Sequence, residues 1–290
     1  MKKTFLFLLL ISLGISTFAQ DYYVCSDLTV EQLFTHNCEG PAVDALGNLY
    51  AVNFQKDGTI AIIAPGKSPE VFLQLPDGSV GNGIRFNSKD EMFVADFINH
   101  NVIKVDLKTR SAEVFVHDTR MKQPNDLAIS SKGILFLSDP DWAKNTGQIW
   151  KVMPDGTLSL LETGMGTTNG IEVAPADDRL YVNESIQKRI WIYDLDENGN
   201  ISNKRLFIEF DDFGLDGMRC DELGNLFVTR YDKGVVCIIS PEGKILREVP
   251  TKGKKTSNVT FGGTDGKTVF VTLQDRGCIE WFRSETAGAR

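Results

Sequence analysis

The feature that most limits how this chain can fold is a short motif that recurs six times at a nearly constant interval. In each copy a turn leads into a short apolar strand, and the copies read GNLYAVN, DEMFVAD, KGILFLSD, DDRLYVNES, GNLFVTR and GKTVFVT. Aligned on the strand, they lie 43, 43, 45, 46 and 43 residues apart. Six units at one period of about 40–50 residues predict an all-β, six-bladed β-propeller. A β-sandwich would not explain the constant long period.

Each unit contains further strands around this motif. A strand such as GIRFN or GIEVA precedes the turn, a third strand such as NVIKVD or RIWIYD follows, and a fourth, weaker strand closes the unit. Short strands with turns every 8–12 residues or so are typical of an all-β chain. Beyond the first 19 residues no segment keeps a helical periodicity over three turns.

The last unit has room for only three strands, near residues 258–261, 268–272 and 278–283, before the chain ends at Arg290. Residues 28–35, LTVEQLFT, form an additional strand ahead of the first unit. We therefore predict that this N-terminal strand pairs with the last blade. Such pairing closes the ring and covers a free sheet edge.

Residues 1–19 combine two lysines, an apolar stretch and small residues ahead of a cleavage point after Ala19. This pattern is typical of a secretory signal. The apolar run is short for a membrane span, and no cysteine for a lipid anchor follows it. We expect a single propeller domain over residues 20–290, located in the periplasm or secreted, with no membrane anchor after cleavage.

Composition adds two expectations. The net charge of −8, the pI near 5.0 and the absence of a Lys/Arg stripe argue against a nucleic-acid partner. Five cysteines remain in the mature chain, and disulfides are stable outside the cytoplasm. The closest pair, Cys25 and Cys38, is the pairing we expect. We expect a monomer.

A set of oxygen-bearing side chains follows the same repeat. At or just before the first strand, the six units carry Glu39, Asn82, Asn125, Asn169, Asp216 and Asn258. In a propeller these strands line the central channel, so equivalent positions converge on the axis. Hard cations, Ca²⁺ first and Mg²⁺ or Mn²⁺ as alternatives, prefer such ligands. Any one asparagine could equally cap a turn, but turn capping explains Glu39, Asn169 and Asp216 together less well.

Five segments, in order, resemble the family of gluconolactonase, regucalcin and luciferin-regenerating enzyme over nearly the whole mature chain. They are CEGPAVDALGNLY, QPNDLAISSKGILFLSDPDW, TNGIEVAPADDRLYVNES, LDGMRCDELGNLFVTR and SNVTFGGTDGKTVFVT. The resemblance implies a six-bladed propeller. It also implies one divalent metal ion held by Glu39 of an EGP motif, Asn169 of an NG motif and Asp216 of a DGM motif. Ca²⁺ is favoured, with Mg²⁺, Mn²⁺ or Zn²⁺ as alternatives.

The same resemblance suggests further roles. Asp216 is similar to the residue assigned as general base, and Asn125 of the PND motif to one that touches substrate or a ligand water. Gln123 stands where animal regucalcins carry an arginine that contacts sugar hydroxyls, so the sugar preference is open. Asp139 and Trp142 of SDPDW are candidate pocket residues, with a turn and a packing aromatic as the alternative. Arg85, Asp126 and Glu184 are further pocket candidates.

The resemblance implies a metal-dependent hydrolase that opens a sugar lactone, a small molecule. A metal-bound carbonyl would be polarised while Asp216 accepts a proton from water. No GxSxG nucleophile motif is present. Two alternatives remain open: an arylesterase or organophosphate hydrolase on the same metal site, and a propeller that binds carbohydrate or protein without catalysis.

Overall fold

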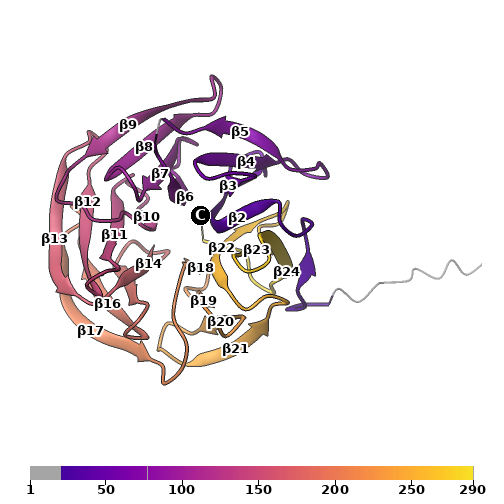
Figure 1. The fold of residues 1–290 in the computed structure, drawn as a ribbon. Coiled ribbons are helices and arrows are strands. Elements are labelled where there is room, and N and C mark those ends of the chain that lie inside the picture. The colour runs from indigo at the N-terminus through magenta and orange to yellow at the C-terminus, as the bar shows by residue number, and fades with distance from the viewer. Residues whose placement is uncertain (1–20, 77, 290) are drawn as a thin grey trace, which may run out of the picture.

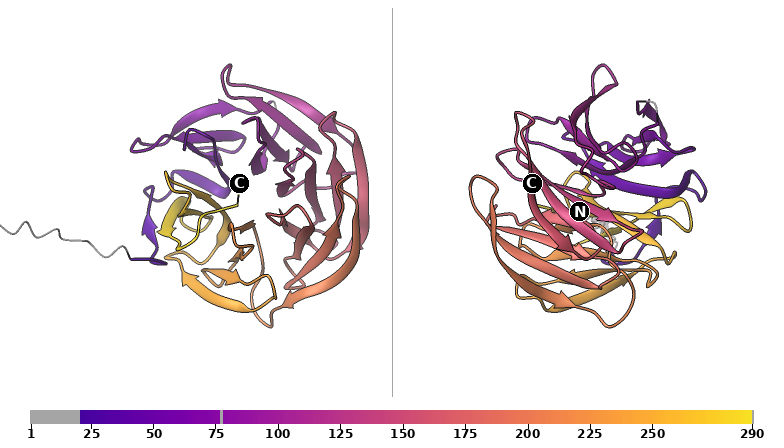
Figure 2. Two further views of the ribbon diagram at one scale, coloured as in Figure 1. Left: turned by 180° about the vertical axis from the view of Figure 1, so that it is seen from behind. Right: turned by 60° about the vertical axis from the view of Figure 1, so that its left-hand side comes forward.

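Six antiparallel sheets of four strands each are arranged around a central channel (Figure 1). The computed structural model describes residues 21–76 and 78–289, and every regular element in these residues is a strand. Figure 2 shows the same ring from behind and from one side. The predicted all-β, six-bladed propeller is confirmed.

Each of the first three blades takes its four strands in sequence order, from the channel outward. Blade 1 contains β2 (Phe34–Val43), β3 (Leu49–Phe54), β4 (Thr59–Ile63) and β5 (Glu70–Gln74). Blade 2 contains β6 (Gly81–Phe86), β7 (Met92–Asp96), β8 (Asn101–Asp106) and β9 (Ser111–His117). Blade 3 contains β10 (Leu127–Ile129), β11 (Leu135–Asp141), β12 (Thr146–Val152) and β13 (Leu158–Met165).

The other three blades follow the same order, except that the last borrows a strand. Blade 4 contains β14 (Thr168–Val173), β15 (Arg179–Glu184), β16 (Arg189–Leu195) and β17 (Ile201–Glu209). Blade 5 contains β18 (Met218–Cys220), β19 (Leu226–Arg230), β20 (Val235–Ile239) and β21 (Ile245–Pro250). Blade 6 contains β22 (Thr256–Gly262), β23 (Thr268–Leu273), β24 (Cys278–Arg283) and β1 (Ser26–Asp27).

The turns between first and second strands show why the motif repeats. In blade 5 the Asp221 carboxylate accepts hydrogen bonds from the backbone N–H groups of Leu223 (3.0 Å) and Asn225 (2.8 Å). Gly224 between them has a φ of 81°, which an L side chain adopts only with strain. The aspartate and the glycine therefore stabilise one tight turn together.

Burial follows the distance from the channel. The second strands β3, β7 and β19 are buried along their whole length, whereas the outer strand β21 is mostly exposed. Hydrophobic clusters join neighbouring blades, as where Val52 of blade 1 packs in one cluster with Ile84 of blade 2. The core thus lies between blade faces and holds them at fixed angles around the channel.

The predicted ring closure is confirmed, but the predicted range of the closing strand is wrong. β1 pairs with β24 through Ser26↔Trp281 and Asp27↔Glu280, and Leu28 N–H donates to the Ile279 carbonyl (2.9 Å). Phe34 already begins β2 on the channel side of blade 1. The segment 28–35 therefore spans a change of blade: residues 28–33 lie in no strand, and Phe34 and Thr35 belong to β2.

The expected Cys25–Cys38 disulfide is not formed, because all five cysteines are free. Cys25 packs against the core cluster of blades 5 and 6, whereas Cys38 lies on β2 in the cluster between blades 1 and 6. The secretory signal predicted at residues 1–19 lies outside the described residues. Within the described residues no helix is long and apolar enough to cross a membrane.

The last described residues cover one end of the channel. Ala289 N–H donates to the carbonyl of Cys220 at the end of β18 (3.0 Å), and Thr286 Oγ1 donates to Asp221 Oδ2 (2.6 Å). In Figure 1 this segment runs toward the centre of the ring. We call this the far end of the channel, and the opposite one the site end.

Candidate functional site

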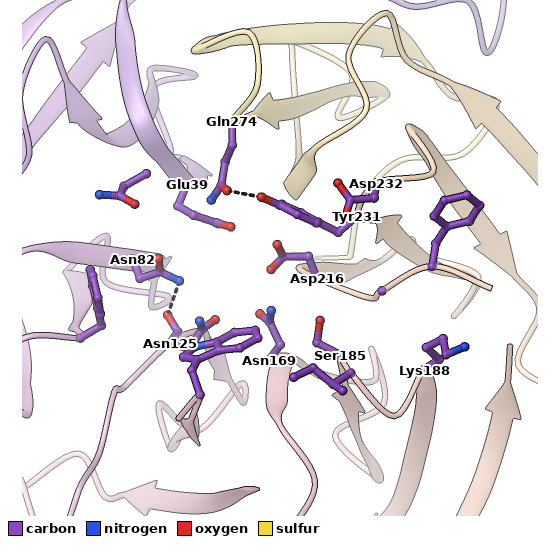
Figure 3. A pocket seen from close by; sticks show the side chains of 16 residues that line it. Glu39, Asn82, Asn125, Asn169, Ser185, Lys188, Asp216, Tyr231, Asp232 and Gln274 are labelled. Carbon is purple, nitrogen blue, oxygen red and sulfur yellow. Dashed lines mark hydrogen bonds between the residues drawn. The ribbon is translucent and has the colours of Figure 1, made fainter. Parts of the chain in front are cut away.

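A cavity of about 610 Å³ opens at the site end of the channel. Five of the six predicted ring residues line it, namely Glu39, Asn82, Asn125, Asn169 and Asp216. In Figure 3 the oxygen-bearing ends of Glu39, Asn169 and Asp216 point into the same space. The fold therefore brings together side chains from five blades, at the positions that the repeat spacing predicted.

Glycine explains how the channel strands come close enough for this. Glu39, Asn82, Asn169 and Asp216 are each followed by glycine. A Cβ on Gly40 would overlap the carbonyl oxygen of Asn82, and one on Gly170 would overlap that of Asp216. Gly40 and Gly170 therefore let the backbone of the next blade approach the bottom of the cavity.

Two carboxylates are buried at the bottom of the cavity. Glu39 is 2% exposed and Asp216 is 7% exposed. Within the described part of the chain neither forms an ion pair with a basic side chain, and Glu39 Oε2 accepts a hydrogen bond from Gly40 N–H (3.0 Å). Burial raises the pKa of Glu39 to about 8. Burial and the nearby Glu39 charge raise the pKa of Asp216 well above its usual value.

Two side-chain amides add oxygen atoms that have no hydrogen-bond donor. Asn125 Oδ1 and Asn169 Oδ1 are buried, and neither has a hydrogen-bond partner among the described residues. Asn82 does not satisfy the first of them, because its Nδ2 donates to the backbone carbonyl of Asn125 (3.1 Å; Figure 3). Buried oxygens without a donor are uncommon, which indicates that a ligand belongs here.

The set of donors fits a hard divalent cation. It offers two carboxylates without a basic partner and two amide oxygens, all from groups that Ca²⁺ accepts. Over residues 21–76 and 78–289, no cluster of three or more His, Cys, Asp or Glu side chains is arranged to hold a metal. Any cation at this site would therefore depend on the asparagines.

An ionic cluster fills the channel below these residues. Arg85 contacts Asp126 Oδ1 and Glu172 Oε2, both at 3.2 Å, and Arg219 lies 3.9 Å from Asp126 Oδ2. Two arginines thus balance two carboxylates, which leaves the charges of Glu39 and Asp216 unbalanced. We call Arg85, Asp126, Glu172 and Arg219 the channel floor.

The remaining ring residue and one pocket candidate have other partners. Asn258 is absent from the cavity lining and donates through Nδ2 to Asp126 Oδ2 of the channel floor (3.5 Å). Its Oδ1 accepts a hydrogen bond from Val259 N–H (2.8 Å). Glu184 also lies outside the lining and binds Gly166 N–H and Arg189 Nε.

The residues predicted to contact substrate divide in the same way. Trp142 lines the cavity, and its backbone N–H donates to Gln123 Oε1 (3.2 Å). Gln123 and Asp139 are not part of the lining. Asp139 is buried and accepts hydrogen bonds from the backbone of Lys122 and Gln123 and from the side chains of Gln148 and Trp150. The structure thus makes Asp139 a support for this loop instead of the predicted pocket residue.

Sequence reasoning missed the turn residues around the mouth of the cavity. The turns after the second strands of blades 4, 5 and 6 contribute Ser185, Tyr231 and Gln274. Tyr231 Oη donates to Gln274 Oε1 (2.9 Å; Figure 3). The available signal was positional, because in five of the six blades the first residue after the second strand lines the cavity.

The fold and this site define a class of protein: a six-bladed propeller with buried oxygen donors at one end of its channel. Residues 37–275 match the family described as the SMP-30/gluconolactonase/LRE-like region, and the chain belongs to this family. The resemblance predicted from the sequence is therefore confirmed.

Three known proteins illustrate the likeness. The gluconolactonase of Zymomonas mobilis is 32% identical over 286 aligned residues, covering 86% of this chain and 79% of the relative. The diisopropyl-fluorophosphatase of Loligo vulgaris is 26% identical, covering 88% and 94%. The structure of a calcium-binding protein, regucalcin, from Agrobacterium tumefaciens matches with a TM-score of 0.80 at 20% identity, covering 91% and 95%. At that identity the structural likeness shows the fold.

Proposed function

We propose that this protein is a lactonase that opens a sugar lactone or a related cyclic ester, with a divalent cation held by Glu39, Asn169 and Asp216. One observation carries the proposal. Two buried carboxylates without a basic partner lie beside two buried amide oxygens without a donor, at the bottom of a cavity. The similarity to a relative named gluconolactonase supports the choice of substrate class.

The residues of the site have separate tasks in this reaction. When bound, the cation would polarise the ester carbonyl and stabilise the charge that develops as water attacks. Asp216 accepts the proton that the attacking water loses. Asn125 Oδ1, which has no donor among the described residues, accepts a hydrogen bond from a substrate hydroxyl and orients the ring. No covalent nucleophile is required.

Calcium is the cation we propose first, because all the donors are oxygen atoms and the three proposed ligands come from three different blades. Such a set can adapt to the larger and less regular coordination of Ca²⁺. Mg²⁺, Mn²⁺ and Zn²⁺ are the alternatives to compare with it.

A second candidate is hydrolysis of an aryl ester or a phosphorus ester at the same site. The relative named diisopropyl-fluorophosphatase matches 88% of this chain, which favours this candidate. The same donors could serve a phosphoryl oxygen in place of a carbonyl oxygen. Turnover of an aldonolactone, an aryl ester and a phosphotriester, measured side by side, separates the two candidates.

We also propose that the mature protein is a periplasmic or secreted monomer. The signal pattern that ends at Ala19 supports the location. N-terminal sequencing of the exported protein should begin at Gln20, and size-exclusion chromatography should give the mass of one chain. Retention of Met1 would contradict the proposed processing.

The test of function is hydrolysis of D-glucono-1,5-lactone, followed with a pH indicator. We expect EDTA to abolish turnover, one divalent ion to restore it, and Asp216→Asn to remove it. Asp211→Asn is the matched control, since Asp211 is an exposed aspartate five residues away. Calorimetry of Ca²⁺ binding supplies a second readout. A protein that binds the ion but opens no lactone or ester would support the non-catalytic alternative.

A further inference from the structure

Three large apolar side chains are exposed at the mouth of the cavity. Trp142 is 38% exposed, Ile186 is 47% exposed and Phe213 is 46% exposed, and all three line the cavity. They come from separate segments, namely the β11–β12 turn, the β15–β16 turn and the connection from β17 to β18. We call these three residues the apolar wall.

The apolar wall is not an extension of the protein core. None of its members belongs to a hydrophobic core cluster of the described residues. Their neighbours in the chain are polar, as Asp141 and Lys144 are around Trp142. Exposing large apolar side chains to water is unfavourable, and a gathering of them usually marks a binding site.

Polar side chains line the cavity over blades 5 and 6. In blades 5 and 6 the turns after the second strands contribute Tyr231, Asp232 and Gln274. Figure 3 shows Tyr231 and Gln274 joined by their hydrogen bond on the side of Glu39 and Asp216. We call these residues the polar wall. The cavity therefore has polar side chains over blades 5 and 6, whereas Trp142 and Ile186 expose large apolar side chains over blades 3 and 4, with Ser185 and Lys188 also in the lining there.

The size of the cavity agrees with a ligand larger than one sugar ring. Its volume of about 610 Å³ falls in the range of about 300–1,000 Å³ typical of sites for drug-sized molecules. A lactone that carries only hydroxyl groups would find partners on the polar wall and at the site base. Such a lactone would leave the side chains of the apolar wall in contact with water.

We infer that the substrate is an amphipathic lactone or ester, with its polar ring against the polar wall and an alkyl or aryl substituent against Trp142, Ile186 and Phe213. This inference rests on the proposed function and specifies its substrate class. The substituent gains affinity by removing apolar surface from water on both sides of the contact.

The experiment compares δ-lactones substituted at C5 with methyl, propyl and pentyl groups against D-glucono-1,5-lactone. For the wild-type protein we expect kcat/KM to rise about three- to fourfold for each added methylene, the effect of burying one such group. In Trp142→Ala and Phe213→Ala, the ratio of kcat/KM for the pentyl lactone to that for gluconolactone should fall about tenfold.

Leu223→Ala is the matched control. Leu223 is also a large exposed apolar residue in a turn, but it lies on blade 5 at the far end of the channel. The ratio should not change in this variant, and melting curves should show that all variants are folded. The inference is wrong if kcat/KM of the wild-type protein does not rise along the alkyl series. It is also wrong if the ratio of kcat/KM for the pentyl lactone to that for gluconolactone falls equally in Leu223→Ala. Neither result contradicts the lactonase proposal.

Failure of the proposed function gives a different result. If no lactone or ester is turned over with any of the four ions, the lactonase proposal is wrong. Calorimetry then measures the affinity for δ-lactams with the same alkyl groups, which tests whether the apolar wall binds such groups. Affinity that grows with chain length and falls in Trp142→Ala supports it as a binding surface, and affinity independent of chain length overturns it.

Discussion

The carboxylates of Asp216, just before β18, and Glu39, on β2, are buried in the same cavity, and the charge of Glu39 raises the pKa of Asp216. The two residues are 177 positions apart in the sequence and belong to blades 5 and 1. Two like charges in a buried site are unfavourable without a counter-ion. The arginines of the channel floor do not supply one, because Asp126 and Glu172 occupy them.

We predict first that divalent cations stabilise the protein. Calcium at a hundred times its dissociation constant should raise the free energy of unfolding by about 2.7 kcal/mol. Differential scanning fluorimetry with EDTA and with added Ca²⁺ measures the shift in melting temperature. Asp216→Asn should lose the shift and Asp211→Asn should keep it. An equal shift in both variants would place the cation elsewhere.

The second prediction concerns the pH dependence of stability at Glu172. Burial raises the pKa of Glu172 from 4.5 to about 7, although Arg85 acts in the opposite direction. The folded state therefore holds a proton that the unfolded state releases above pH 4.5. This contribution to stability is complete below pH 4.5 and is lost as the pH rises to about 7. The total loss is about 3 kcal/mol.

Urea unfolding between pH 4 and pH 8 measures this effect in the wild type and in Glu172→Gln. The glutamine cannot ionise, so the difference in unfolding free energy between the two proteins should change over this pH range. If the unfolding free energies of the two proteins change in parallel with pH, the raised pKa of Glu172 is wrong.

A third prediction is that Arg85→Met destabilises the protein by about 3–5 kcal/mol, because it leaves two buried carboxylates short of a partner. Both charged partners of Arg85 are largely buried. The control is Arg110→Met, whose ion pair with Glu70 is exposed and should contribute less than about 1 kcal/mol. Equilibrium unfolding in urea gives both values. If the two variants lose equal free energy of unfolding, the buried ion pairs of the channel floor contribute no more than an exposed pair.

The fourth prediction tests the close approach of the channel strands. Gly40 has a φ of 57°, and a Cβ there would overlap the backbone of Asn82. Gly66 has a φ of 70° and open space around it. Gly66→Ala should therefore cost about 1 kcal/mol for backbone strain, and Gly40→Ala about 3 kcal/mol more because the overlap is added.

The same Gly40→Ala variant should bind calcium more weakly, since Glu39 is the adjacent residue. Calorimetry of the folded variants checks this. If Gly40→Ala and Gly66→Ala lose equal stability and bind calcium equally well, the glycine is not needed for strand approach.

The propeller and most of the residues at the bottom of the cavity could be predicted, because the repeat indicates which backbone positions are equivalent in the six blades. Residues at equivalent positions of equivalent strands must meet at the channel, so the spacing of Glu39, Asn169 and Asp216 located them without any knowledge of contacts. The same argument could not predict Asn258. It has the correct spacing, but its side chain is bound to Asp126, which belongs to another blade.

The sequence by itself determined the number of blades, the ring closure and the family, because these depend on periodicity and on local motifs. Only the tertiary structure decided that Asp139 supports a loop, that Arg85 and Arg219 balance the channel floor, and that the cavity has an apolar and a polar wall. These features depend on side chains from different blades. Their partners are distant in sequence, so no spacing along one chain reports which of them meet.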